Sequence, residues 1–184
     1  MKFISQKIPD IILIKPDIKE DNRGYFVETF RKDLLEETVG FKINFIQDNE
    51  SKSKKGVLRG LHYQLPPYSQ AKLIRVTEGR VLDVSVDIRK SSPFFGKHVA
   101  VELASDNKHQ LFVPHGFAHG FVILSDFATF TYKVDNYYAP DYDRGIAFND
   151  KDLDIDWKIP HELLRLSEKD EAHPTLAKTK DLFE

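Results

Sequence analysis

The chain has 184 residues, enough for one ordinary domain, and no cysteine, which excludes disulfides, thiolate zinc sites and a cysteine nucleophile. Lysine and arginine number 27 against 29 aspartates and glutamates, so the net charge of −2 lacks the basic excess typical of nucleic-acid-binding proteins. Hydrophobic residues make up 41% of the chain, which argues against disorder. No segment has the length and apolar character of a signal peptide or a membrane span. We therefore expect a cytoplasmic protein with neither nucleic-acid nor membrane partners, whose seven histidines are available for metal binding or proton transfer.

Short segments of alternating apolar and polar residues dominate the chain. Within residues 81–88, four aliphatic side chains share one face, and Asp83, Ser85 and Asp87 share the other. Similar strands are predicted at 43–47, 57–64, 73–77, 99–103, 110–113, 121–124 and 129–134. Many strands separated by turn signals indicate an antiparallel sandwich or barrel. Helices are expected only at 33–39, which ends at Gly40, and as one or two short ones within 160–173.

The first polar cluster lies in residues 21–30. The pattern predicts a turn at 22–24 that leads into an edge strand, with Glu28 facing solvent. Arg23 and Glu28 lie five positions apart, so a regular strand would point them to opposite sides. Alone, this segment leaves a structural and a functional role equally open.

The second cluster places Arg59 and His62 in an otherwise apolar strand, with Gly60 between them. A buried arginine is costly unless an anion or a carboxylate meets it, and its guanidinium group suits a phosphate. The odd separation would place the two side chains on opposite faces of a flat strand. A bulge at Gly60 would bring both toward one cavity.

Four further positions have simple structural explanations. Lys72 could be a solvated strand end, His119 a core histidine bonded to a neighbour, and Tyr132 a core aromatic whose hydroxyl needs a partner. Ser167 and Asp170 match the Ser-x-x-Asp pattern of a helix capping box. Each is ambiguous by itself.

Taken in order, these motifs resemble the dTDP-4-dehydrorhamnose 3,5-epimerase family. The resemblance covers about residues 3–176 and is carried by Asp21…Arg23-Gly24…Phe26…Glu28, Gln47-Asp48-Asn49…Ser51, Gly56-Val57-Leu58-Arg59-Gly60-Leu61-His62-Tyr63-Gln64, Pro114…Gly116-Phe117-Ala118-His119-Gly120-Phe121 and Tyr137-Tyr138-Ala139-Pro140. One departure is visible at Phe148, where the family often has tryptophan.

The resemblance implies an all-β, cupin-type double-stranded β-helix (jelly roll) with a few short peripheral helices. It implies one domain over 1–184, with the jelly-roll core at roughly 40–140 and a peripheral C-terminal segment at 150–184. It also implies a homodimer that works in dTDP-L-rhamnose biosynthesis, which supplies lipopolysaccharide or cell-wall polysaccharide.

The implied substrate is dTDP-4-dehydro-6-deoxy-D-glucose (dTDP-4-keto-6-deoxyglucose). Its C4 ketone acidifies the hydrogens at C3 and C5, so both centres can be inverted through enolates to give dTDP-4-dehydro-L-rhamnose. Such chemistry needs a base on one face, a donor to the enolate oxygen and an acid on the other face. By resemblance, His62 partnered by Asp170 is the base, Lys72 stabilises the enolate oxygen and Tyr132 is the acid, with no cofactor.

The family's contacts to nucleotide or sugar match twelve positions of this chain. The implied substrate-binding residues are Arg23, Phe26, Glu28, Gln47, Asp48, Asn49, Arg59, Lys72, His119, Tyr138, Asp143 and Lys169.

Three other functions compete with this interpretation. A metal-dependent cupin usually needs His-x-His, but this chain reads His62-Tyr63-Gln64, so no metal site is expected. An epimerase that acts at one centre only, or on a related keto sugar, could keep the same base and acid. A non-catalytic sugar-nucleotide-binding barrel predicts the loss of His62, Lys72 or Tyr132, and all three are present.

Overall fold

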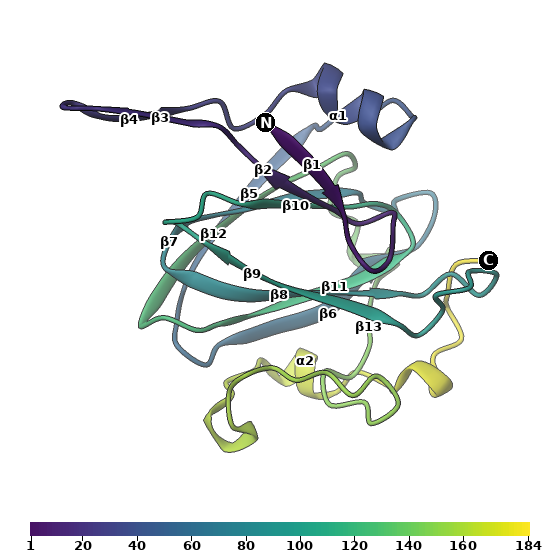
Figure 1. The fold of residues 1–184 in the computed structure, drawn as a ribbon. Coiled ribbons are helices and arrows are strands. Elements are labelled where there is room, and N and C mark those ends of the chain that lie inside the picture. Colours follow the sequence, from purple (N-terminus) through teal and green to yellow (C-terminus); the bar gives the residue numbers. More distant parts are fainter.

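A computed structural model describes residues 1–184, and two antiparallel β-sheets that face one another form its centre (Figure 1). The first sheet has the order β1 (Lys2–Ser5), β2 (Ile12–Lys15), β10 (Gln110–Val113), β7 (Lys72–Glu78), β12 (Phe127–Val134) and β5 (Gln47–Lys54). The second has the order β13 (Asp143–Gly145), β6 (Leu58–Gln64), β11 (Phe117–Ile123), β8 (Arg80–Asp87) and β9 (His98–Ala104). Neighbours far apart in sequence, such as β6 beside β11, are typical of a jelly roll, so the predicted all-β class is confirmed.

Helices are short and peripheral, as predicted. α1 (Lys32–Val39) ends at Gly40, whose left-handed φ of 81° terminates the helix, and α2 (Glu168–Glu171) is a single turn. Three 3-10 turns lie at Pro140–Tyr142, His161–Leu163 and Leu176–Lys178. No helix of the chain combines the length and apolar character needed to cross a membrane.

Three apolar clusters hold these layers together. One lies between the sheets and includes Phe121 and Phe130. A second joins the outer face of the five-stranded sheet to the C-terminal segment through Trp157, and a third packs Leu35 of α1 on the outer face of the other sheet. Figure 1 shows α1 and the C-terminal segment on opposite sides of the two sheets. The interior cluster thus fills part of the space between the sheets, and the other two attach α1 and the C-terminal segment to their outer faces.

Strand β8 shows how its alternating pattern is used. Its aliphatic residues, among them Val84 and Val86, pack outward against the C-terminal segment. Its polar residues Asp83, Ser85 and Asp87 are fully buried, and they lie on the face turned toward the other sheet. The polar face of this strand is thus the interior one.

The bulge expected at Gly60 is confirmed. On β6 and β11, His62 pairs with His119 while Arg59 pairs with Phe121, so β6 carries one extra residue across the shift. Gly60 has a φ of +135°, and a Cβ there would lie 2.5 Å from the Cα of Gly120. Only glycine fits this position, and the bulge brings Arg59 and His62 to one cavity.

One local expectation is wrong. The segment 43–47 is no strand; β5 begins at Gln47 and runs to Lys54, and Ile43 instead packs in the cluster beneath α1. The turn at 22–24 is confirmed, and it leads into an edge strand that is followed by an exposed Glu28. It joins β3 (Ile18–Asp21) to β4 (Gly24–Val27) in a separate hairpin that projects from the body of the molecule (Figure 1).

Candidate active site

A polar cavity of about 310 Å³ opens between the two sheets. Both sheets supply its lining, which consists of Asn49, Glu50, Ser51, Arg59, His62, Tyr63, Gln64, Gln70, Lys72, His119, Phe121, Phe130, Tyr132, Tyr138 and Asp143. Its volume lies at the lower end of the range for small-molecule sites. Eight of the fifteen predicted site residues, among them His62, Lys72 and Tyr132, therefore converge on one space.

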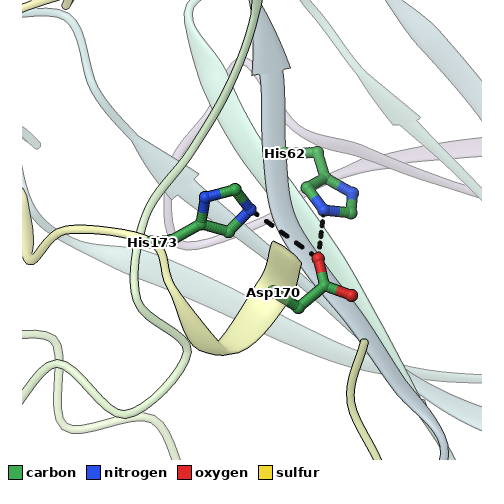
Figure 2. A group of neighbouring side chains, drawn as sticks. All are labelled: His62, Asp170 and His173. Atoms are coloured by element: carbon green, nitrogen blue, oxygen red, sulfur yellow. Dashed lines mark hydrogen bonds and ion pairs between the residues drawn. The ribbon is translucent and has the colours of Figure 1, made fainter. Parts of the chain in front are cut away.

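His62 forms a close pair with Asp170 of α2 (Figure 2). The imidazole Nε2 lies 2.5 Å from the carboxylate Oδ1. Ser167 caps α2 by accepting a hydrogen bond from the Asp170 backbone N–H, and its hydroxyl donates to Asp170 Oδ2 at 2.9 Å. The cap by Ser167 is thus confirmed, although Asp170 bonds to the Ser167 hydroxyl rather than to its backbone N–H, and this cap coexists with the bond from Asp170 to His62.

The charge of Asp170 and the orientation of its bond to His62 suit proton transfer. Burial acts to raise the pKa of Asp170, but the contacts with the imidazoles of His173 and His62 outweigh it and hold that pKa well below its usual value. An ionised Asp170 that accepts the Nε2–H of His62 leaves Nδ1 of the imidazole with the free lone pair. The His62 side chain is 34% exposed, so this nitrogen can meet a ligand in the cavity.

Lys72 lies on the opposite wall, in β7 of the six-stranded sheet. A solvated strand end is the wrong interpretation, because the residue is buried. This burial lowers the pKa of the Lys72 ammonium to about 8, against the opposing pull of the carboxylates of Asp143 and Asp83. Lys72 is therefore a cation in a low-dielectric setting that keeps its charge at neutral pH and can lose it in mildly alkaline solution.

His119 faces the cavity next to His62 and is bonded to Asp83, with Nε2 2.8 Å from Oδ2. The expectation of a core histidine bonded to a neighbour is confirmed. Burial lowers the pKa of His119, although Asp83 acts in the opposite direction. The imidazole is therefore held neutral at physiological pH.

Tyr132 of β12 stands on the same wall as Lys72, across from the two histidines. Burial raises the pKa of its phenol, with the charge of Arg59 opposing, so the hydroxyl keeps its proton at neutral pH. Its ring packs against Phe130, which stacks on Phe121 with 3.7 Å between ring centroids. The stacked rings of Phe130 and Phe121 thus hold the phenolic donor of Tyr132 in place.

Arg59 lies at the exposed edge of the cavity rather than in the interior. The expectation of a buried arginine is wrong, because the bulge turns the side chain toward the opening. Its Nη2 donates to Ser53 Oγ at 3.3 Å, which leaves most of the guanidinium donors for an anion. The geometry suits a phosphate that enters from solvent.

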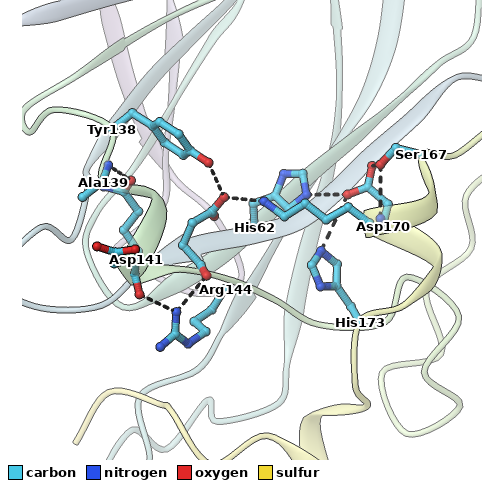
Figure 3. A network of polar contacts seen from close by, with 11 residues as sticks. His62, Tyr138, Ala139, Asp141, Arg144, Ser167, Asp170 and His173 are labelled. Atoms are coloured by element: carbon cyan, nitrogen blue, oxygen red, sulfur yellow. Dashed lines mark hydrogen bonds and ion pairs between the residues drawn. The ribbon is translucent and has the colours of Figure 1, made fainter.

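A second polar chain lines the other edge of the opening (Figure 3). The hydroxyl of Tyr138 donates to Asp143 Oδ2 at 3.0 Å, and Lys169 Nζ lies 2.5 Å from the same oxygen. Gln47 donates to Asn49 Oδ1 at 2.8 Å, and Asn49 faces the cavity. These contacts link the mouth of the cavity to the segment that carries Asp170.

Four of the expected binding residues lie away from the cavity. Asp48 pairs with Lys133 at 2.9 Å and lines a neighbouring groove, which shares Asn49, Glu50 and Tyr132 with the cavity. Arg23 bonds to Asp21 on the projecting hairpin, where Phe26 is 69% exposed. Glu28 follows the hairpin, 3.8 Å from Arg31. Within one chain, none of the four reaches His62.

Sequence reasoning missed three residues at the site. Asp83 could have been found from the polar face of its strand, since a buried carboxylate needs a partner. Gln64 accepts from the Ala139 N–H at 2.7 Å and donates to Tyr68 O at 2.6 Å, so its amide organises the loop that carries Tyr138. The third missed residue, His173, follows Asp170 by three positions. One ligand atom each from His62, Asp170 and His173 lies within 4.8 Å of the other two, which is close enough to surround a metal ion.

The fold and cavity define a class of protein. They describe a cupin-type β-barrel in which a histidine–carboxylate pair on one wall faces a buried lysine and a protonated tyrosine on the other, an arrangement suited to acid–base chemistry.

Comparison with known proteins identifies the family. Residues 5–178 match the family model described as dTDP-4-dehydrorhamnose 3,5-epimerase. The chain is 54% identical over 170 residues to the dTDP-4-dehydrorhamnose 3,5-epimerase of Shigella flexneri, which covers 92% of this chain and 93% of that protein. The chain therefore belongs to the dTDP-4-dehydrorhamnose 3,5-epimerase family.

Two solved structures illustrate the structural similarity. The dTDP-6-deoxy-D-glucose-3,5-epimerase of Legionella pneumophila, in complex with dTDP-4-keto-L-rhamnose, superposes with a TM-score of 0.95 at 44% identity, covering all of this chain and 97% of that one. ChmJ, a 3'-monoepimerase from Streptomyces bikiniensis in complex with dTDP-quinovose, superposes with a TM-score of 0.86 at 34% identity, covering 94% of this chain and 86% of that one.

Proposed function

We propose that this protein is a dTDP-4-dehydrorhamnose 3,5-epimerase that inverts C3 and C5 of dTDP-4-dehydro-6-deoxy-D-glucose to give dTDP-4-dehydro-L-rhamnose. The observation that carries the proposal is the placement of the His62–Asp170 pair opposite Lys72 and Tyr132 in one cavity. We place the reaction in the cytoplasm, where activated nucleotide precursors are made.

In the first step His62 removes a proton. Nδ1 of His62 takes the proton from C3 or C5 of the sugar. The electrons of the broken C–H bond form a double bond to C4, and the negative charge of the resulting enolate moves to the C4 oxygen. Asp170 accepts the Nε2–H and so stabilises the imidazolium that forms. The carboxylate fixes the ring orientation as well, because Ser167 holds its second oxygen.

Lys72 supports the charge that develops at the C4 oxygen. A cation in a buried site interacts more strongly with an enolate than the same cation in water. Because burial lowers the pKa of Lys72 to about 8, the ammonium persists at neutral pH and disappears in mildly alkaline solution.

Tyr132 returns a proton from the other wall. Its phenol is protonated at neutral pH, and it stands across the cavity from His62. Delivery to the face opposite the one from which the proton left inverts the carbon. His62 then loses its extra proton to solvent and Tyr132 regains one from solvent, so the same steps can be repeated at the second carbon to complete the double epimerisation.

The cavity of about 310 Å³ suits the sugar ring, with the nucleotide extending past Arg59 toward the opening. The guanidinium of Arg59 supplies cationic donors for the diphosphate, as does Lys169 once the substrate competes for its bond to Asp143. His119, Asn49 and Tyr138 line the remaining walls as the proposed sugar and nucleotide contacts.

The protein works, in this proposal, as a homodimer. Arg23, Phe26 and Glu28 are expected substrate contacts, yet they lie on or next to a hairpin that projects into solvent. An exposed aromatic on such a hairpin, here Phe26 of β4, is typical of a segment that docks on a second copy. A hairpin supplied by a second copy would bring these three side chains to a cavity.

An epimerase that acts at one centre is the second candidate. The observation in its favour is the structural likeness to ChmJ, which is named a 3'-monoepimerase. The same base and acid serve either outcome, and sugar placement decides between them.

Product analysis tests the proposal. The purified protein is incubated with dTDP-4-keto-6-deoxyglucose in heavy water, a downstream NADPH-dependent reductase traps the product, and NMR locates deuterium. We expect deuterium at both C3 and C5 and a product of the L-rhamno configuration. Label at one carbon supports the single-centre alternative, and no label with intact substrate contradicts both.

A further inference from the structure

His173 carries an unexplained nitrogen beside the catalytic pair. Its side chain is only 10% exposed, and its Nε2 is buried without a hydrogen-bond partner. This nitrogen lies 3.7 Å from Asp170 Oδ1, which is too long for a hydrogen bond. The ring meets that of His62 edge-on, with 5.5 Å between centroids (Figure 2).

The chain makes room for this imidazole. Gly145 pairs with His62 in the register of β13 and β6, and a Cβ at Gly145 would lie 2.3 Å from His173 Nε2. Any other residue at 145 would displace the ring. His173 is therefore packed against the backbone beside His62 and directed at Asp170.

We propose that His62, Asp170 and His173 form an inhibitory binding site for a divalent transition-metal ion such as Zn²⁺. Two imidazole nitrogens and one carboxylate oxygen form a typical ligand set for this ion. The ligand atoms lie within 4.8 Å of one another.

The observed spacings fit this ion after a small adjustment. Zinc bonds of about 2.0–2.2 Å in a tetrahedron separate neighbouring ligand atoms by roughly 3.4 Å. The two separations from Asp170 Oδ1, 2.5 Å to His62 Nε2 and 3.7 Å to His173 Nε2, bracket this value. Ser167 orients the carboxylate through its other oxygen, which is the second-layer support that metal ligands usually have.

The inhibitory effect rests on the proposed role of His62. A metal ion between His62 Nε2 and the Asp170 carboxylate oxygen replaces the hydrogen bond that joins them. The proton of the neutral His62 imidazole then moves from Nε2 to Nδ1. Nδ1 is the atom that would accept the substrate proton, so the base is lost without any net release of protons. His173 binds likewise through Nε2, with its own proton on Nδ1. A metal here turns the reaction off rather than serving it.

Metal binding by the full-length, metal-free protein tests the proposal. Co²⁺ is followed by its visible absorption, and Zn²⁺ affinity is measured by competition with a chromophoric chelator. We expect one ion per chain with tetrahedral absorption, and inhibition of epimerisation that a chelator reverses. His173→Phe, which keeps the ring shape above Gly145, should weaken Zn²⁺ binding at least about 100-fold, because loss of a residue that only supports a ligand already costs about 10–100-fold.

A matched control separates this site from nonspecific binding. His115 pairs with Asp135 at 2.9 Å on the surface and has no third ligand, so His115→Gln should leave Zn²⁺ affinity unchanged. The site is overturned if His173→Phe binds Zn²⁺ like the wild type, or if His115→Gln abolishes binding. If His173→Phe fails to fold, His173→Asn replaces it with the same expectation.

The two proposals fail in different ways. Binding of Zn²⁺ at the trio without loss of epimerisation overturns the inhibitory role alone. A protein that has no epimerase activity under metal-free conditions contradicts the proposed function, and the binding data still decide whether the site exists.

Discussion

Two histidine–aspartate pairs face the same cavity and differ in access. His62 is 34% exposed, and its partner Asp170 comes from the C-terminal segment. His119 is 8% exposed, and its partner Asp83 lies in the same sheet. Burial lowers the pKa of His119, so this imidazole is a neutral and fixed hydrogen-bonding group. The difference teaches that the same two residue types suit different tasks: in the proposed reaction the more exposed His62 transfers protons, whereas the buried, neutral His119 offers a fixed hydrogen-bonding group on the cavity wall.

The largest expected effect tests the exposed pair. Asp170→Asn removes the charge that stabilises the His62 imidazolium, so we expect kcat to fall by about 10²–10⁴-fold, the usual scale of general acid–base catalysis. Steady-state kinetics with the coupled reductase measures it. A kcat within a factor of two or so of the wild type would show that Asp170 only caps α2.

Lys72 should give the next largest effect and a pH signature. Lys72→Met removes the cation at the enolate oxygen, and we expect a loss of about 10²–10³-fold in kcat. In the wild type, the pKa of about 8 means that the ammonium is lost as pH rises through that value, so kcat/KM should fall above about pH 8. A profile that stays flat to pH 10 would contradict a role for the charged form.

Much of this arrangement could be predicted from the sequence, and the failures have physical causes. The strands with apolar alternation were found, but β5 reads Gln-Asp-Asn-Glu-Ser-Lys-Ser-Lys and offers no hydrophobic pattern, although it pairs with β12 along its whole length. The bulge at Gly60 was predicted, but Arg59 was expected to be buried because its neighbours are apolar, and it lies instead at the open edge of the cavity. Local patterns do not show where a cavity opens to solvent.

The hairpin and His173 show a second limit on what the sequence alone can predict. The motif at Arg23 and Phe26 was evident, but its position in space depends on how the hairpin leaves the barrel. His173 gave no pattern of its own, and only the folding of the C-terminal segment onto β6 and β13 brings it to His62. Contacts between segments far apart in sequence decide both cases.

The buried pair should respond in stability more than in rate. Asp83→Asn takes away the carboxylate that His119 bonds to inside the protein. We expect a loss of roughly 1–3 kcal/mol in the free energy of unfolding, because a buried hydrogen-bonding group loses its charged partner. Urea denaturation measures it, and kcat should fall by much less than in Asp170→Asn. An equal fall in kcat for both variants would remove the distinction between the pairs.

The bulge that pairs His62 with His119 is tested by its effect on stability alone. Gly60→Ala should lower the free energy of unfolding by about 1–3 kcal/mol, since its Cβ meets the Cα of Gly120 at 2.5 Å in addition to the cost of a positive φ. Gly40→Ala is the control, because Gly40 has a φ of +81° but nothing within 4 Å of the added atom. Urea denaturation should rank Gly60→Ala as the more costly of the two.

The most direct test of the central claim compares the two histidines by hydrogen exchange. Wild-type protein, His62→Asn and His119→Asn are incubated with the keto sugar nucleotide in heavy water, and NMR follows deuterium at C3 and C5. Circular dichroism and thermal unfolding verify that each variant is folded. We expect His62→Asn to abolish exchange at both carbons, whereas His119→Asn retains exchange at a reduced rate. Near-normal deuterium incorporation by a folded His62→Asn variant would contradict the assignment of His62 as the base.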